Sequence, residues 1–187
     1  MTKHRPCFNF GYLALAAYFL LAPQADAVAA GASADVQNSS ALQPVQANAQ
    51  HLLAVRYANG DGMPADMPKA AFWFGKAAAQ GYARSQYNLG VMFDRGDGVA
   101  QQPRQAAHWY RKAADQGLAE AQRALGLLYA KGVGVPKNLE RAYFWLLLAS
   151  VEGNNDVIQL RNAIEIELTP QQKAQAQTDA RNWKPRP

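Results

Sequence analysis

The sequence predicts an all-α fold, a solenoid of three 36-residue helix-pair repeats followed by C-terminal capping helices. Residues recur in phase at this spacing without gaps, each unit holds two stretches of helical apolar periodicity, and the pattern stops after Gly153. The clearest columns are Gly60, Gly96 and Gly132; Gly62, Gly98 and Gly134; Gly81, Gly117 and Gly153; and Trp73, Trp109 and Trp145.

The N-terminal residues differ in composition from the repeats. Lys3 and Arg5 precede a twelve-residue apolar run over 10–21, and Ala25 and Ala27 give the small-x-small pattern of a cleavage site. We therefore expect residues 1–27 to be a signal peptide cleaved near Ala27, which makes the protein periplasmic or secreted in a bacterium. A retained anchor is the alternative, although the run is short for a spanning helix. Contact with a membrane is expected only in that case.

Residues 28–46 are mostly Ala, Gln, Ser and Asn without apolar periodicity, which predicts a flexible leader.

The cysteine content and the charge distribution limit how the fold is stabilised and which partners it binds. Cleavage would remove Cys7, the only cysteine, so that packing alone would stabilise the fold. The net charge of +5 is spread along the chain without a Lys/Arg block, and no nucleic-acid partner is expected.

The first helix of each unit presents one apolar face. In the middle unit Gln86, Leu89 and Phe93 recur at i, i+3 and i+7. Gly90 lies on the same face. Because a glycine inside a helix costs about 1 kcal/mol relative to alanine, its use predicts close approach by another helix. Gly96 and its equivalents are expected to end these helices in the left-handed conformation.

The second helix of each unit begins at a capping signal. Asp66 and Asn138 are good N-caps, and in the middle unit Pro103 stands at the first helical position. Small and bulky residues such as Ala70 and Trp73 alternate on one face, which lets neighbouring helices interlock. We expect the three tryptophans to be packing anchors between units.

The residues after Gly153 predict a cap. An apolar helical period continues to Leu168, and Thr169 to Gln172 form a capping box with proline at the first position of a last helix. Residues 154–187 should therefore form polar-faced capping helices, which cover the open end of a solenoid.

The segment from Gln86 to Gln122, which includes Y-N-L-G and W-Y-R-K-A-A-D-Q-G, looks like the Sel1-like repeat, a relative of the tetratricopeptide repeat. The resemblance covers roughly 47–153, in units of about 47–82, 83–118 and 119–153. It implies antiparallel helix pairs in a right-handed superhelix, with the first helices lining a concave surface. It also implies an adaptor that binds proteins in envelope regulation, polysaccharide export or host contact. Met63 departs from the usual valine, and the disulfides of some secreted members cannot form.

The concave face is the predicted partner-binding site. Its stripe mixes aromatic, apolar and basic side chains, which suits an acidic or amphipathic peptide segment. An ordinary solvated helix face is an equally good interpretation of the same pattern. The predicted residues are His51, Tyr87 and Arg123, then Val91 and Leu127, and one turn further Asn59, Arg95 and Lys131.

The sequence offers no catalytic constellation. His51 and His108 are expected in different helices of different units, without the spacing of metal ligands. No enzyme activity, metal or cofactor is therefore predicted. The alternative is an enzyme or binder of the bacterial envelope that recognises cell wall or β-lactams, as has been linked to some cysteine-rich relatives. The sequence does not identify the partner, the pathway or the oligomeric state.

Overall fold

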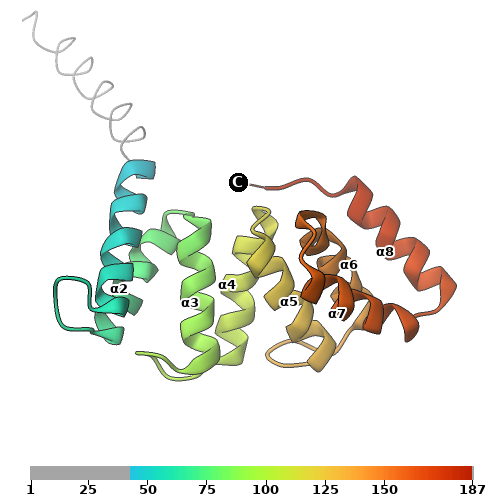
Figure 1. Ribbon diagram of the computed structural model, residues 1–187, viewed down its shortest axis with the longest axis horizontal. Helices are drawn as coiled ribbons and strands as arrows, with labels where there is room; N and C mark the ends of the chain where they lie inside the picture. The colour runs from blue at the N-terminus through green and yellow to red at the C-terminus, as the bar shows by residue number, and fades with distance from the viewer. Residues whose placement is uncertain (1–42, 187) are drawn as a thin grey trace, which may run out of the picture. The chain divides into compact units, whose positions relative to one another are not determined.

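The computed structural model describes residues 43–186, and over this range the chain is helical, with no strand (Figure 1). A first helix covers residues 43–59. The elements that follow are α2 (Met67–Ala79), α3 (Ala83–Arg95), α4 (Pro103–Asp115), α5 (Ala119–Lys131), α6 (Leu139–Ala149), the short 3₁₀ helix η1 (Ser150–Glu152), α7 (Asn155–Ile166) and α8 (Pro170–Asn182).

The helices pack in the order of the predicted repeats. Within a unit, α3 packs on α4 and α5 on α6; between units, α2 packs on α3 and α4 on α5. Figure 1 shows successive helices side by side along one direction. This arrangement confirms the predicted all-α solenoid of helix pairs.

The predicted helix ends are confirmed. The Asp66 carboxylate accepts a hydrogen bond from the backbone N–H of Lys69 at 2.9 Å, and the Asn138 side chain accepts one from Arg141 at 2.8 Å. Gly96 ends α3 with a φ of 82°, in the left-handed region that favours glycine.

The glycines inside the first helices mark close helix contacts, as expected. A Cβ atom on Gly90 would lie 2.7 Å from the ring of Tyr110, and one on Gly126 would lie 2.9 Å from Leu146. Each contact joins the two helices of one unit. The energetic cost of glycine in these helices is therefore offset by packing.

A buried glutamine ties each unit to the preceding one. The side-chain amide of Gln86 donates to the backbone carbonyl of Ala78 at 3.1 Å, and Gln122 repeats the bond to Ala114 at 3.3 Å. These carbonyls lie in the last turns of α2 and α4, where each also accepts the backbone N–H of the glycine after the helix, Gly81 or Gly117. The buried amides of the glutamine column therefore find an acceptor in the preceding unit, and this bond links consecutive units.

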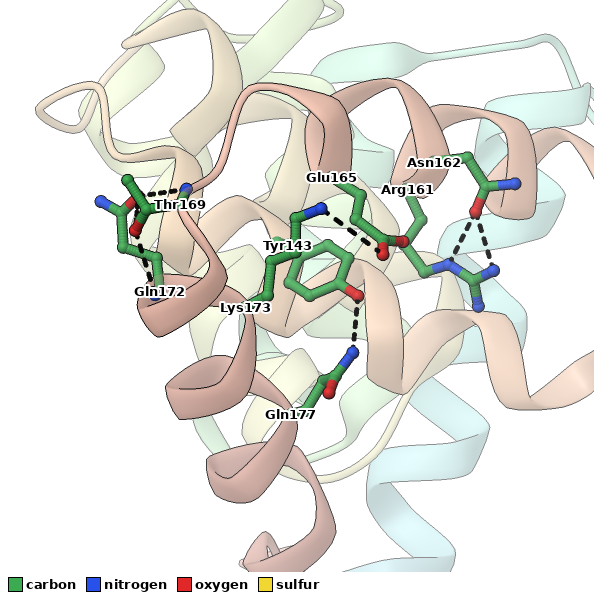
Figure 2. A network of polar contacts seen from close by, with 8 residues as sticks. All are labelled: Tyr143, Arg161, Asn162, Glu165, Thr169, Gln172, Lys173 and Gln177. Atoms are coloured by element: carbon green, nitrogen blue, oxygen red, sulfur yellow. Dashed lines mark hydrogen bonds and ion pairs between the residues drawn. The ribbon is translucent and has the colours of Figure 1, made fainter.

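The C-terminal helices pack against α6 and form the predicted cap. Thr169 and Gln172 make the capping box at the start of α8. Figure 2 shows the polar contacts that hold α7 and α8: Gln177 donates to the hydroxyl of Tyr143 at 3.2 Å, and Lys173 lies 4.0 Å from Glu165.

One predicted boundary is wrong. The leader was expected over 28–46, but residues 43–46 are already helical. Ala47 is buried and the Tyr82 hydroxyl donates to Asn48 at 3.2 Å, so the helix is held at the predicted start of the first unit, and residues 43–46 add an exposed turn before it. The predicted signal peptide lies outside the described residues. Within 43–186, no helix has the length and hydropathy to cross a membrane.

Candidate partner-binding site

The first helices position the predicted stripe by their period. Tyr87, Val91 and Arg95 stand at i, i+4 and i+8 in α3, and Arg123 and Lys131 take the equivalent positions in α5. Residues spaced by four lie on one side of a helix. The stripe therefore follows the helix axis in each unit.

Two stripe residues from different units border one hollow. A cavity of about 280 Å³ lies between the first helix and α3, with Asn59 on one side and Val91 on the other. Its lining is mostly apolar, with Asp97 at the turn after α3. The other residues that border it are Val55, Ala58, Met67, Phe74, Asn88 and Met92.

Of this lining, the predicted site residues include Asn59 and Val91 alone. Met67 and Phe74 belong to α2, a second helix, whereas the predicted stripe drew only on first helices. Asn88 could have been included in the predicted site because it is adjacent to Tyr87 in the sequence. Nothing in the repeat pattern indicated that Met67 or Phe74 would line the hollow. The hollow does not extend to Arg123, Leu127 or Lys131 of α5.

The basic members of the stripe carry unpaired charge. Arg95, Arg123 and Lys131 are exposed, and the ion pairs found within 43–186 are Lys69–Asp66 and Lys173–Glu165 alone. Arg95 and Lys131 stand in the last turns of α3 and α5, where the helix dipole favours a cation. This surface can therefore attract an anionic group.

The prediction that His51 lies on the exposed stripe is wrong. Its imidazole is buried, with Nδ1 2.9 Å from the hydroxyl of Ser85 and the ring packed against Phe74 and Tyr82. The position faces the next first helix rather than solvent. Tyr87, its equivalent in the middle unit, is half-buried and its ring lies 5.7 Å from that of Tyr110.

Burial of His51 should make stability depend on pH. Burial first, and the charge of Arg84 second, lower the pKa of His51 below its usual value of 6.5. The unfolded chain therefore binds a proton more readily than the folded one. We expect the His51 contribution to be complete above pH 6.5 and lost as pH falls through the lowered folded pKa. Thermal unfolding of wild type and His51→Gln from pH 7 to pH 5 measures it.

His108→Gln is the matched control, because His108 is exposed on α4. This variant should lose as much thermal stability on acidification as the wild type does, whereas His51→Gln should lose less. An equal loss in all three proteins would contradict the assignment to His51.

The described residues hold no group of three or more His, Cys, Asp or Glu side chains placed to bind a metal ion. His108 lies against Trp109, with ring centroids 5.2 Å apart, and His51 packs in the first unit. The structure therefore does not bring the two histidines into one site.

Comparison with known proteins agrees with the geometry. The Sel1 repeat model matches residues 47–82, 83–118 and 119–154. A Sel1 repeat protein from Oxalobacter formigenes is similar in structure, with 37% identity and a TM-score of 0.58 over 60% of this chain and 46% of that one. No curated protein sequence matches.

A second solved structure is c5321, a protective antigen present in uropathogenic Escherichia coli strains and displaying an SLR fold. It is 38% identical, with a TM-score of 0.66, over 73% of this chain and 29% of that one. The chain thus spans less than half the length of either protein. Three consecutive matches that cover more than half of the sequence show that the chain belongs to the Sel1 repeat family.

Proposed function

We propose that the chain is an exported scaffold that binds an acidic or amphipathic segment of a partner protein along its first-helix stripe. Sel1 repeats generally serve protein–protein interaction. The observation that carries the proposal is the hollow between Asn59 and Val91. One turn further along α3 than Val91, Arg95 is exposed and forms none of the ion pairs found within 43–186.

The hollow and the cations suit different parts of such a segment. An apolar side chain would enter the space lined by Val55, Val91 and Met92, where it would lose contact with water. Carboxylates on the same segment would face Arg95, Arg123 and Lys131. Because these cations are exposed, they would act mainly on the association rate and on salt dependence.

Charge reversal tests the stripe. A photo-cross-linking amino acid at Tyr87, introduced in a bacterial host, should yield a covalent adduct with a discrete partner protein. The triple variant Arg95→Glu, Arg123→Glu and Lys131→Glu should lose about tenfold or more of that adduct, since several like-charge contacts replace attractive ones. Immunoblotting of the adduct measures it.

The control reverses three exposed cations elsewhere, Lys137, Arg181 and Lys184, and should leave the adduct unchanged. Retention of the adduct by the stripe variant would contradict the proposed site. Export rests on the basic and apolar N-terminal pattern, and the intact mass of the adduct-forming chain tests it: export with cleavage gives a start near Val28. A chain that keeps residues 1–27 would contradict cleavage but not the stripe.

A further inference from the structure

A second hollow lies on the other helices of the repeat, between α2 and α4. Its volume is about 650 Å³, and its lining includes Leu89 and Phe93 of α3 and Trp109 of α4. Phe72 of α2 stands at its edge with 56% of its surface exposed. None of these residues belongs to the first-helix stripe.

Gly75 holds this hollow open. It lies inside α2, its φ is not in the left-handed region, and a Cβ atom there would meet nothing within 4 Å. Glycine costs about 1 kcal/mol relative to alanine in such a position. Gly90 and Gly126 offset that cost by close packing, but Gly75 does not. Neither the backbone nor the fold requires glycine here.

The next unit shows the same position filled. Arg111 stands 36 residues after Gly75, and its guanidinium lies 5.2 Å from the ring centroid of Trp145, the equivalent of Trp109. Arg111 also donates to the hydroxyl of Tyr129, which replaces Phe93. The arginine and the tyrosine hydroxyl thus occur together at the boundary between the second and third units, and the glycine and the phenylalanine at the boundary between the first and second.

The corresponding hollow beside Arg111 is bordered by α8 and has carboxylates in its lining. It retains about 380 Å³, and Ala176 and Asp179 of α8 line it together with Glu140 of α6. The hollow at Gly75 is lined by twelve residues that include one cation, Lys76, and no carboxylate. Lys112 adds a second ammonium group 5.1 Å above the ring of Trp109. An occupant with a negative charge would therefore complement this surface.

We propose that the hollow between α2 and α4 binds an aromatic side chain of a partner segment, flanked by carboxylates that face Lys76 and Lys112. The ring would pack in the space that Gly75 leaves, against Phe93 and Trp109, as Arg111 packs against Trp145 in the next unit. This site uses different residues from the stripe, so the two proposals stand or fall separately.

Two peptides test it on the ¹⁵N-labelled full chain. One has a tryptophan between two pairs of glutamates, and the other has the same tryptophan between two pairs of lysines. We expect the glutamate peptide to shift the resonances of the Gly75 amide and the Trp109 indole N–H, and to bind about tenfold or more tightly than the lysine peptide. Equal affinities, no binding, or shifts confined to Tyr87 and Val91 would overturn the proposal.

Gly75→Arg makes the decisive variant because it reproduces the arginine of the next unit. It adds a positive charge and yet should weaken the glutamate peptide about tenfold, since the side chain fills the hollow. Stronger binding would show simple charge attraction and overturn the proposal. Gly75→Ala, whose methyl group fills less of the space, should weaken the peptide less than Gly75→Arg does. Lys76→Glu, which leaves the hollow open, should abolish the preference for glutamate; an unchanged preference would also overturn it.

Discussion

Replacing Gly134 by alanine is expected to lower the free energy of unfolding by about 3 kcal/mol or more. Gly134 has a φ of +69°, which costs an L-residue about 1–2 kcal/mol. A Cβ atom there would also lie 2.2 Å from the backbone carbonyl oxygen of Pro103, the first residue of α4. Because the obstacle is backbone, the turn and α4 would have to separate.

Substitutions at two other glycines separate the cost of the left-handed backbone from the cost of the steric contact. Gly81 has a φ of +88° but no atom within 4 Å of its Cβ position, so Gly81→Ala should cost only the conformational part, about 1–2 kcal/mol. Gly75 has neither feature, and Gly75→Ala should stabilise the protein by up to about 1 kcal/mol. Urea unfolding followed by circular dichroism measures all three. An equal loss for Gly134→Ala and Gly81→Ala would show that the turn does not contact α4 as described.

The two glycines of each turn differ in how far sequence could predict them. The first, such as Gly96, ends a helix, and its left-handed conformation follows from local chemistry alone. The second faces the preceding unit: Gly98 lies against Met67 and Gly134 against Pro103, in each case 31 residues earlier. Periodicity showed that the position matters but not why, because the contact exists only once the units are stacked.

The candidate site shows the same division. The period of the first helices placed Asn59 and Val91 on one stripe, and they do border one hollow. It also placed His51 there, but Tyr82 at the end of the same unit and Ser85 of the following unit bury the imidazole. A helical period gives the side of a helix on which a residue lies. It does not give the distance to the next helix, and this distance decides whether that side is groove or interface.

The hollow at Gly75 could have been suspected from the sequence in one way. When the units are aligned, Gly75 corresponds to Arg111 and Phe93 corresponds to Tyr129. The hollow therefore has a glycine where the next repeat has an arginine, and a phenylalanine where the next repeat has a tyrosine. The alignment alone does not show that these positions meet across two helices. Because α2, α3 and α4 all contribute to the lining, the hollow depends on the packing between units.

Trp145→Ala should give the second large loss, about 3–5 kcal/mol of unfolding free energy. Trp145 is 3% exposed, and it packs edge-on to Phe144 and Trp183 with ring centroids 4.9 and 6.4 Å away. It also supports the guanidinium of Arg111 from α4. The substitution therefore leaves a cavity where the third unit meets both the second unit and the C-terminal residues.

Trp109→Ala is the matched comparison, because the same repeat position is only half-buried there. No C-terminal tryptophan packs on Trp109, so its loss should be about half that of Trp145 in proportion to the apolar area involved. Equal losses would mean that the two tryptophans anchor their units alike, and would contradict the partial exposure of Trp109 beside Gly75. A larger loss at Trp145 instead separates the roles of one repeat column: Trp145 stabilises the stack, whereas Trp109 leaves part of its ring available to a partner.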